Sequence, residues 1–362
     1  MKNLIIITLL ATVLSLSLVL QAADFGTVRD PYVGNWTGTL TIDSKEEKVY
    51  ATIIEYKQWY ELTFRAQLDT RLEPMVTCYG VELKGTLNLE SVANKPILSV
   101  EESEAIEKSK EAEKAPPIKG LKWQNQPMGN ELIGTFKGLK IGHYSLTKIP
   151  FPPSPTLGEK SPSGALVLFD GNDLKAWESR KTPAEPILWK LVDSEAVEVV
   201  SLRDGKKNKQ DLATKELFSD YRLHLEFKLA DKPDAIGQGR SNSGIIHLGL
   251  YETQILDSFG LYGRNNECGG IYKTREPDSN AVYPAGLWQT YDIEVKAPRF
   301  DAEGKKTADA RLTVRLNGVL VQNEVSVPKP TGPGKEVARG PIVLQDHGNP
   351  VQFRNIWAIK SN

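Results

Sequence analysis

Residues 251–257, Tyr-Glu-Thr-Gln-Ile-Leu-Asp, hold the residue types best suited to chemistry. Side chains alternate between the two faces of a β-strand, so Glu252 and Gln254 share one face and Asp257 lies on the other. A carboxylate beside an amide can bind hydroxyl groups, and a carboxylate with a tuned pKa can also act as an acid or base. The alternative is a polar face turned to solvent.

A second cluster of polar residues lies near the C-terminus, between the apolar segments 342–345 and 351–357. We predict a hairpin with Asp346 and His347 at its corner, where the histidine could act as a general base. Phe353, Asn355, Trp357 and Ile359 are predicted to share the apolar face of the returning strand. Arg354 then points the other way, where its guanidinium could bind a carbonyl oxygen or orient Glu252.

If both segments belong to one sheet, Glu252, Gln254 and Arg354 converge on one site with His347 at its rim. The alternative for the C-terminal cluster is a polar hairpin with a structural salt bridge.

Other polar or reactive residues are weaker candidates. Apart from Arg240, residues 239–244 are small or carry an amide, so Asn242 marks either a close approach to a ligand or a turn. His247 is more readily a packed or surface histidine, and His224 is predicted to lie at the surface. Cys268 has no base beside it in sequence, and whether it pairs with Cys78 is open.

The strand-forming segments define two domains. Residues 24–149 contain short strands at spacings near ten residues, which predicts a small antiparallel meander or barrel. The proline-rich residues 150–163 predict an exposed, extended linker. From 164 to 362 an all-β pattern without a long helical period predicts a jelly-roll sandwich. A charged run at 101–114 predicts a solvated helix within the first domain.

The first 23 residues predict a secretory signal peptide, because Lys2 precedes a nearly unbroken apolar run from Leu4 to Leu20. The alternative is an uncleaved anchor. With cleavage, the mature protein is expected to be periplasmic or extracellular and free of the membrane.

Composition narrows the range of partners. The chain has 45 basic and 46 acidic residues among 362, so no basic excess indicates nucleic-acid binding. Four histidines and two cysteines offer no zinc-finger spacing, and no glycine-rich phosphate loop is present. No cofactor is identified, although a bound divalent cation and the oligomeric state stay open.

A series of weak motifs, in order, resembles the family of 3-keto-disaccharide hydrolases over about residues 164–362. The landmarks are Asp170-Gly171, Trp177, Trp189, Asn242-Ser243-Gly244, Tyr251-Glu252, Gln254-Ile255-Leu256-Asp257, Gly270-Ile271-Tyr272, Asn317-Gly318, Leu344-Gln345, His347-Gly348 and Phe353-Arg354-Asn355-Ile356. A charged insertion at 301–309 and Asp346 depart from the pattern, and the N-terminal domain lies outside it.

The resemblance implies a concanavalin-A-like sandwich that cleaves glycosides carrying a ketone at C3 of the sugar. It implies Glu252, His347 and Arg354 as catalytic residues, with the assignment of base, acid and donor open. The implied substrate-binding residues are Asn242, Gln254, Asp257, Tyr272 and Gln345. Since this fold also serves lectins, a non-catalytic carbohydrate-binding module is the alternative, and a scaffold domain that docks surface proteins is a third possibility.

Overall fold

The computed structural model describes residues 26–56, 59–82, 87–92, 127–128, 130–200, 202–203, 206–207 and 209–361. Apart from one 3₁₀ turn at Gly237–Gly239, the regular structure in these ranges is β-strand, as predicted. No helix in the described ranges has the length and apolar character to cross a membrane. The predicted signal peptide and the predicted helix at 101–114 lie outside the described residues.

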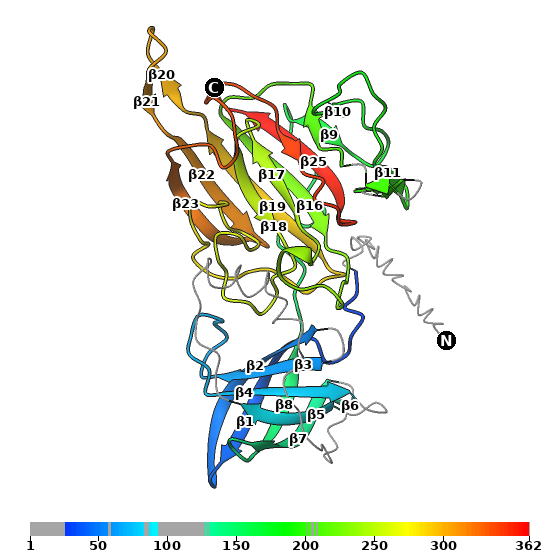
Figure 1. The fold of residues 1–362 in the computed structure, drawn as a ribbon, viewed down its shortest axis with the longest axis vertical. Coiled ribbons are helices and arrows are strands. Elements are labelled where there is room, and N and C mark those ends of the chain that lie inside the picture. The colour runs from blue at the N-terminus through cyan, green and yellow to red at the C-terminus, as the bar shows by residue number, and fades with distance from the viewer. Residues whose placement is uncertain are drawn as a thin grey trace, which may run out of the picture.

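The N-terminal domain is a closed β-barrel (blue to green in Figure 1). Its sheet runs β5-β4-β3-β2-β1-β8-β7-β6, and a parallel β5–β7 pairing closes seven of these strands into a ring. The strands are β1 (Gly34–Ile42), β2 (Lys45–Tyr56), β3 (Trp59–Arg65), β4 (Val76–Glu82), β5 (Leu87–Val92), β6 (Pro127–Met128), β7 (Glu131–Gly138) and β8 (Gly142–Ile149).

The C-terminal domain is a sandwich of two sheets. The smaller sheet has the order β10-β15-β24-β17-β18, and the larger has the order β11-β12-β25-β16-β19-β22-β23 with β9 beside β25. The smaller sheet comprises β10 (Trp177–Ser179), β15 (Leu212–Thr214), β24 (Val343–Leu344), β17 (Ser243–His247) and β18 (Tyr251–Ile255). The larger comprises β9 (Leu166–Phe169), β11 (Lys190–Val192), β12 (Ala196–Glu198), β16 (Tyr221–Lys228), β19 (Trp288–Lys296), β22 (Ala310–Leu316), β23 (Val319–Val327) and β25 (Gln352–Lys360).

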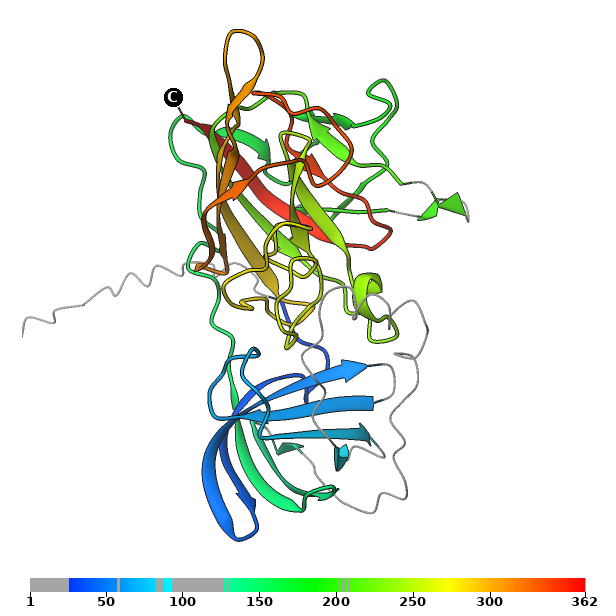
Figure 2. The same cartoon turned by 60° about the vertical axis from the view of Figure 1, so that its left-hand side comes forward.

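Two further hairpins lie outside both sheets. They are β13 (Leu202–Arg203) with β14 (Lys206–Lys207), and β20 (Arg299–Phe300) with β21 (Lys306–Ala308). The second hairpin is formed by the charged insertion and projects from the sandwich (Figures 1 and 2).

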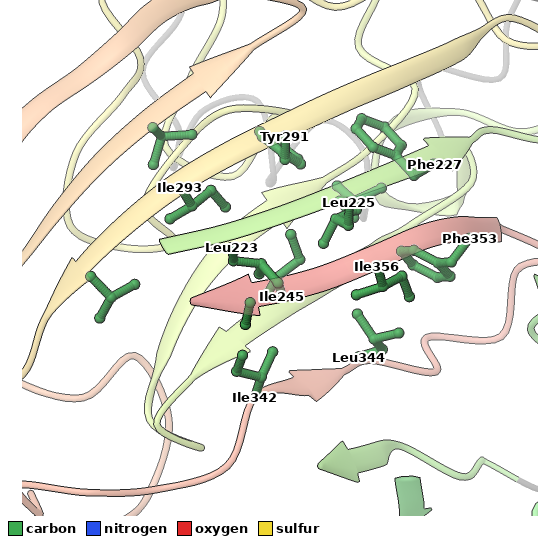
Figure 3. Close-up of a cluster of buried hydrophobic side chains, with 14 of the residues drawn as sticks. Leu223, Leu225, Phe227, Ile245, Tyr291, Ile293, Ile342, Leu344, Phe353 and Ile356 are labelled. Carbon is green, nitrogen blue, oxygen red and sulfur yellow. The ribbon is translucent and has the colours of Figure 1, made fainter. Parts of the chain in front are cut away.

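The hydrophobic core fills the space between the two sheets (Figure 3). Leu223, Leu225 and Phe227 of β16 point inward, as the alternation of that segment predicts, and meet Ile245 of β17 and Leu344 of β24. Burying each such side chain contributes about 1.5–3 kcal/mol. This burial fixes which residues of each strand are left on the two outer faces.

The C-terminal cluster is not a hairpin, and this corrects the sequence-based prediction. Strand β24 belongs to the smaller sheet and β25 to the larger one, so the residues between them cross from one sheet to the other. A β-bulge at Asn355, whose φ is 46°, then shifts the alternation of β25. Phe353, Ile356 and Ala358 face the core, while Arg354 faces outward from the larger sheet.

Most residues of the predicted linker are exposed, as predicted, but one part of it contacts the sandwich. Residues 154–159 pack against the outer face of the larger sheet, where the Thr156 hydroxyl donates to Asp292 at 2.7 Å. The Gly158 amide donates to Glu226 at 2.6 Å, and the Glu159 carbonyl accepts from Asn355 at 2.9 Å.

His224, predicted at the surface, is fully buried. Its ring stacks on Trp357 of β25, and its Nδ1 atom hydrogen-bonds Asp292 at 2.7 Å.

The two cysteines do not pair. Cys78 is buried in the barrel and Cys268 in the sandwich, and both are free thiols.

Candidate functional site

The alternation predicted for residues 251–255 is confirmed in β18. Tyr251 and Ile255 enter the core, while Glu252 and Gln254 lie on the outer face of the smaller sheet. Strand β17 pairs antiparallel with β18 and places Ile246 opposite Glu252 and Gly244 opposite Gln254. This outer face, the Glu252 face below, is the centre of the candidate site.

Glycine at position 244 makes room for the Glu252 carboxylate. A Cβ atom added there would lie 2.5 Å from Glu252 Oε1, closer than such atoms can approach. The Gln345 amide, from the segment after β24, hydrogen-bonds the same carboxylate, and the Gln345 backbone amide donates to the Gly244 carbonyl at 2.9 Å. Glu252 is therefore seated over Gly244 and held by Gln345.

The environment of Glu252 raises the pKa of its carboxyl group to about 7. Burial is the main cause, since the residue is 8% exposed, and the charge of Asp211 adds to it. The Gln345 hydrogen bond and the charges of Lys273 and Arg180 act in the opposite direction. A carboxyl group that titrates near neutral pH is suited to accept and return a proton.

A set of amides extends the Glu252 face. Gln238 accepts from Asn242 at 2.8 Å and from Gln254 at 3.2 Å, and Gln254 also donates to the Asn266 carbonyl at 3.1 Å. The side-chain oxygens of Gln254, Asn266 and Gln345 are buried and have no donor among the described residues. Because buried acceptors are normally paired, these three are suited to receive hydrogen bonds from a ligand rich in hydroxyl groups.

The crossover after β24 forms one side of the site. His347 lies at the surface, but its ring is partly desolvated; this desolvation and the charge of Lys209 lower the pKa of the imidazole, which favours the neutral form that can act as a base. Asp346, predicted to share the corner with this histidine, has its own partners. It is buried and accepts from the backbone amides of Gln210 at 3.0 Å and Gly348 at 2.9 Å.

Arg354 does not join Glu252, which corrects the predicted constellation. It lies on the outer face of the larger sheet, with the core of the sandwich between the two faces. Its Nε atom donates to Glu226 at 2.6 Å and its guanidinium stacks over Trp288, 4.0 Å from the ring centre. This arrangement assigns Arg354 to the structure of the larger sheet.

Two predicted substrate-binding residues also have other partners. Asp257 follows the end of β18 and forms a buried ion pair with Arg240 at 2.6 Å, beside the barrel. The Tyr272 amide donates to the Glu252 carbonyl at 2.9 Å, so the Tyr272 backbone borders the site while its half-buried ring lies near Lys273. Sequence reasoning missed Asn266, whose signal was its place four residues before Gly270 in an otherwise unassigned loop.

One group of possible metal ligands, Glu159, His224 and Asp292, lies on the outer face of the larger sheet. Burial opposes protonation of His224, but hydrogen bonds to Asp292 and Glu226 outweigh it and raise the pKa to about 9. In this arrangement His224 pairs with Asp292, and Asp292 also accepts from the Thr156 hydroxyl of the linker.

A known family of domains matches the C-terminal sandwich. The model of the 3-keto-α-glucoside-1,2-lyase-like domain matches residues 164–359, and no curated protein matches the chain. Three solved structures of Parabacteroides distasonis ATCC 8503 proteins, each provisionally assigned as a glycosyl hydrolase, are similar. The first has 36% identity and a TM-score of 0.49 and covers 59% of this chain and 93% of its own.

The second has 18% identity and a TM-score of 0.40, covering 55% of this chain and 95% of its own. The third has 21% identity and a TM-score of 0.39, covering 54% and 99%. The fold, the Glu252 face and the family match define a carbohydrate-active β-sandwich protein. The chain belongs to the 3-keto-α-glucoside-1,2-lyase-like domain family.

The Gly244→Ala substitution tests the seating of Glu252. We expect the new methyl group to displace the carboxylate and to lower any activity of the site by at least about tenfold, as for a misplaced acid–base group. Gly332→Ala is the matched control, because a Cβ there meets nothing within 4 Å. Equal turnover in both variants would contradict the assigned position of Glu252.

Proposed function

We propose that this protein cleaves glycosides whose sugar has been oxidised to a ketone at C3, with Glu252 as the base. The observation that carries the proposal is a buried carboxyl group with a pKa near neutrality, seated over Gly244, in a chain of this family. The ketone acidifies the hydrogen on C2, so a base of moderate strength can remove it.

The elimination divides into two steps. Glu252 takes the C2 proton, and the electron pair of the C–H bond moves into an enolate on the C3 oxygen. The enolate then re-forms the ketone with a C1–C2 double bond, and the C1–O bond breaks as the leaving oxygen gains a proton. Addition of water across C1–C2 converts this elimination into net hydrolysis.

The enolate oxygen needs a hydrogen-bond donor or a positive charge. Arg354, one of the three residues considered for the catalytic roles, lies on the other outer face. Lys273 replaces it in the proposal, since its ammonium group is exposed and its charge acts on Glu252. Arg180 also acts on Glu252, but its guanidinium is bonded to the Gly249 carbonyl at 2.9 Å and paired with Asp211.

The test compares a 3-keto-glucoside with the unoxidised glucoside as substrates for the full chain. We expect cleavage of the keto-sugar only, with the C2 position exchanging its hydrogen in deuterated water. C2 exchange is the sharper readout, since an ordinary glycosidase mechanism leaves that bond intact. Cleavage of both sugars without C2 exchange would contradict the proposal.

A non-catalytic carbohydrate-binding module is the second candidate. The three unpaired amide oxygens on the Glu252 face favour it, because they suit hydroxyl groups whether or not a bond is broken. Binding of both sugars by calorimetry, with cleavage of neither, would support this reading over catalysis.

A further inference from the structure

The N-terminal barrel contacts the chain segment that borders the candidate site. This segment, residues 258–283, is called the 258–283 loop; it follows β18 and lies at the end of the sandwich that faces the barrel (yellow in Figure 2). Part of the loop runs alongside β18, where the backbone amide of Gln254 donates to the Gly270 carbonyl at 2.9 Å. The side-chain amide of Gln254 donates to the backbone carbonyl of Asn266 at 3.1 Å. The loop therefore forms the border of the Glu252 face.

Arg71 of the barrel holds both ends of one part of this loop. Its guanidinium donates to the carbonyl oxygens of Tyr262 at 3.3 Å and Gly263 at 3.0 Å, and also to that of Pro277. The guanidinium also lies over the Tyr262 ring, 5.1 Å from its centre. One side chain thus ties together two points that are separated in sequence by residues 264–276.

A second contact fixes the start of the loop. Gly260 lies against the barrel so closely that a Cβ atom there would be 2.6 Å from Ile54 Cδ1. Arg240, which pairs with Asp257 just before the loop, donates to the Glu55 carbonyl of the barrel at 3.0 Å. The barrel therefore contacts the loop at two places. One is where the loop leaves β18, and the other is where Arg71 bonds residues 262, 263 and 277.

The segment closed by Arg71 carries three groups of the candidate site. These are Asn266, the Tyr272 amide that bonds the Glu252 carbonyl, and Lys273. Ordering each residue of an irregular segment costs about 1–2 kcal/mol of backbone entropy. A long loop therefore needs contacts whose favourable free energy offsets this cost. Arginine suits the task because its planar fork presents five donors to carbonyl groups.

We propose that the N-terminal barrel orders the loop that borders the sugar site. In this proposal Arg71 is a positioning residue that holds residues 264–276 in their binding conformation. The kinetic consequence rests on the proposed function, whereas the structural consequence does not. The barrel thereby has a role in a reaction whose candidate residues all lie in the other domain.

The test uses the full chain with Arg71→Ala, and Arg339→Ala as control, since Arg339 is exposed and pairs with Glu216 outside the site. We expect amide hydrogen exchange in residues 264–276 to accelerate at least about tenfold, with exchange in the core strands unchanged. We expect KM for the 3-keto-glucoside to rise at least about fivefold, and Arg71→Lys to recover part of the loss. The limb of the pH profile set by Glu252 should stay in place, because β18 keeps its own sheet partner.

Unchanged exchange in residues 264–276 would overturn the proposal that Arg71 holds this segment, called the Arg71 clamp. Faster exchange there with an unchanged KM would overturn its role in the sugar site. Faster exchange throughout both domains, with a lowered melting temperature, would make Arg71 a residue of general stability and would also overturn the proposal. If the unaltered protein turns over no keto-sugar, the proposed function fails, while the exchange experiment still decides the clamp.

Discussion

The Glu252→Gln variant is expected to fold and to lose at least about a hundredfold in turnover of a 3-keto-glucoside, the upper part of the range for an acid–base group. Glutamine keeps the shape of the side chain and its seat over Gly244 but cannot accept the C2 proton. In the unaltered protein, kcat/KM should rise with pH through about 7, as the Glu252 carboxyl group ionises. The variant should lose this limb of the pH profile.

The same variant should be more stable than the unaltered protein at alkaline pH. In the folded chain Glu252 keeps its proton up to a pKa of about 7, whereas in the unfolded chain it releases it near the usual value of 4.5. Between these values the folded state binds more protons, so its stability falls as the pH rises. At about 1.4 kcal/mol per pKa unit, the variant should gain on the order of 3 kcal/mol above pH 7 and nothing below pH 4.

Denaturant unfolding at pH 4 and pH 8 measures this difference, with Glu195→Gln as a control at an exposed carboxylate. A stability gain at pH 8 with full turnover would leave Glu252 buried as described but remove it as the base. His347 would then be the next candidate, because its neutral imidazole is exposed at the side of the site.

The part of the site that could be predicted from the sequence depends on local periodicity. The side chains of β18 alternate with period two, so the shared face of Glu252 and Gln254 follows from spacing alone. That both outer positions are buried does not follow from spacing. It depends on Ile246 of β17, on the glycine opposite Gln254 and on Gln345, which the chain reaches more than 80 residues later.

The position of Arg354 could not be predicted in the same way. A turn between two apolar strands has the same pattern whether the strands pair in one sheet or face each other across a core. Leu344 and Phe353 both enter that core from opposite sheets. The bulge at Asn355 adds a shift of one residue, which reverses the face of every later side chain.

The contacts of the linker could not be predicted for a related reason. Its proline content indicates an extended, exposed chain, and most of its residues are exposed, but residues 155–158 turn and contact the sandwich. Its backbone and hydroxyl groups supply hydrogen bonds to Glu226 and Asp292, two carboxylates on strands far along the chain. A prediction from composition has no access to such partners.

The second large effect is expected for Arg354→Met, which should destabilise the fold by about 3–5 kcal/mol, as for removal of one partner of a buried ion pair. Methionine retains an aliphatic contact with Trp288 but leaves Glu226 without its guanidinium. Burial opposes ionisation of Glu226, yet hydrogen bonds from His224, Asn355 and Arg354 outweigh it and lower the pKa to about 2. Denaturant unfolding near pH 7 measures the loss.

The double variant Glu226→Gln with Arg354→Met is the matched comparison. It removes both charges, so it should recover much of the lost stability, as paired replacements of buried ions often do. A depressed pKa stabilises the fold above the usual carboxyl value and loses this effect as the pH falls toward 2, so the difference between Arg354→Met and the unaltered chain should narrow in acid. Turnover per folded molecule should be unchanged, because Arg354 faces away from Glu252 across the core. A stable but inactive Arg354→Met variant would return this arginine to the catalytic machinery and contradict the site assigned to the smaller sheet.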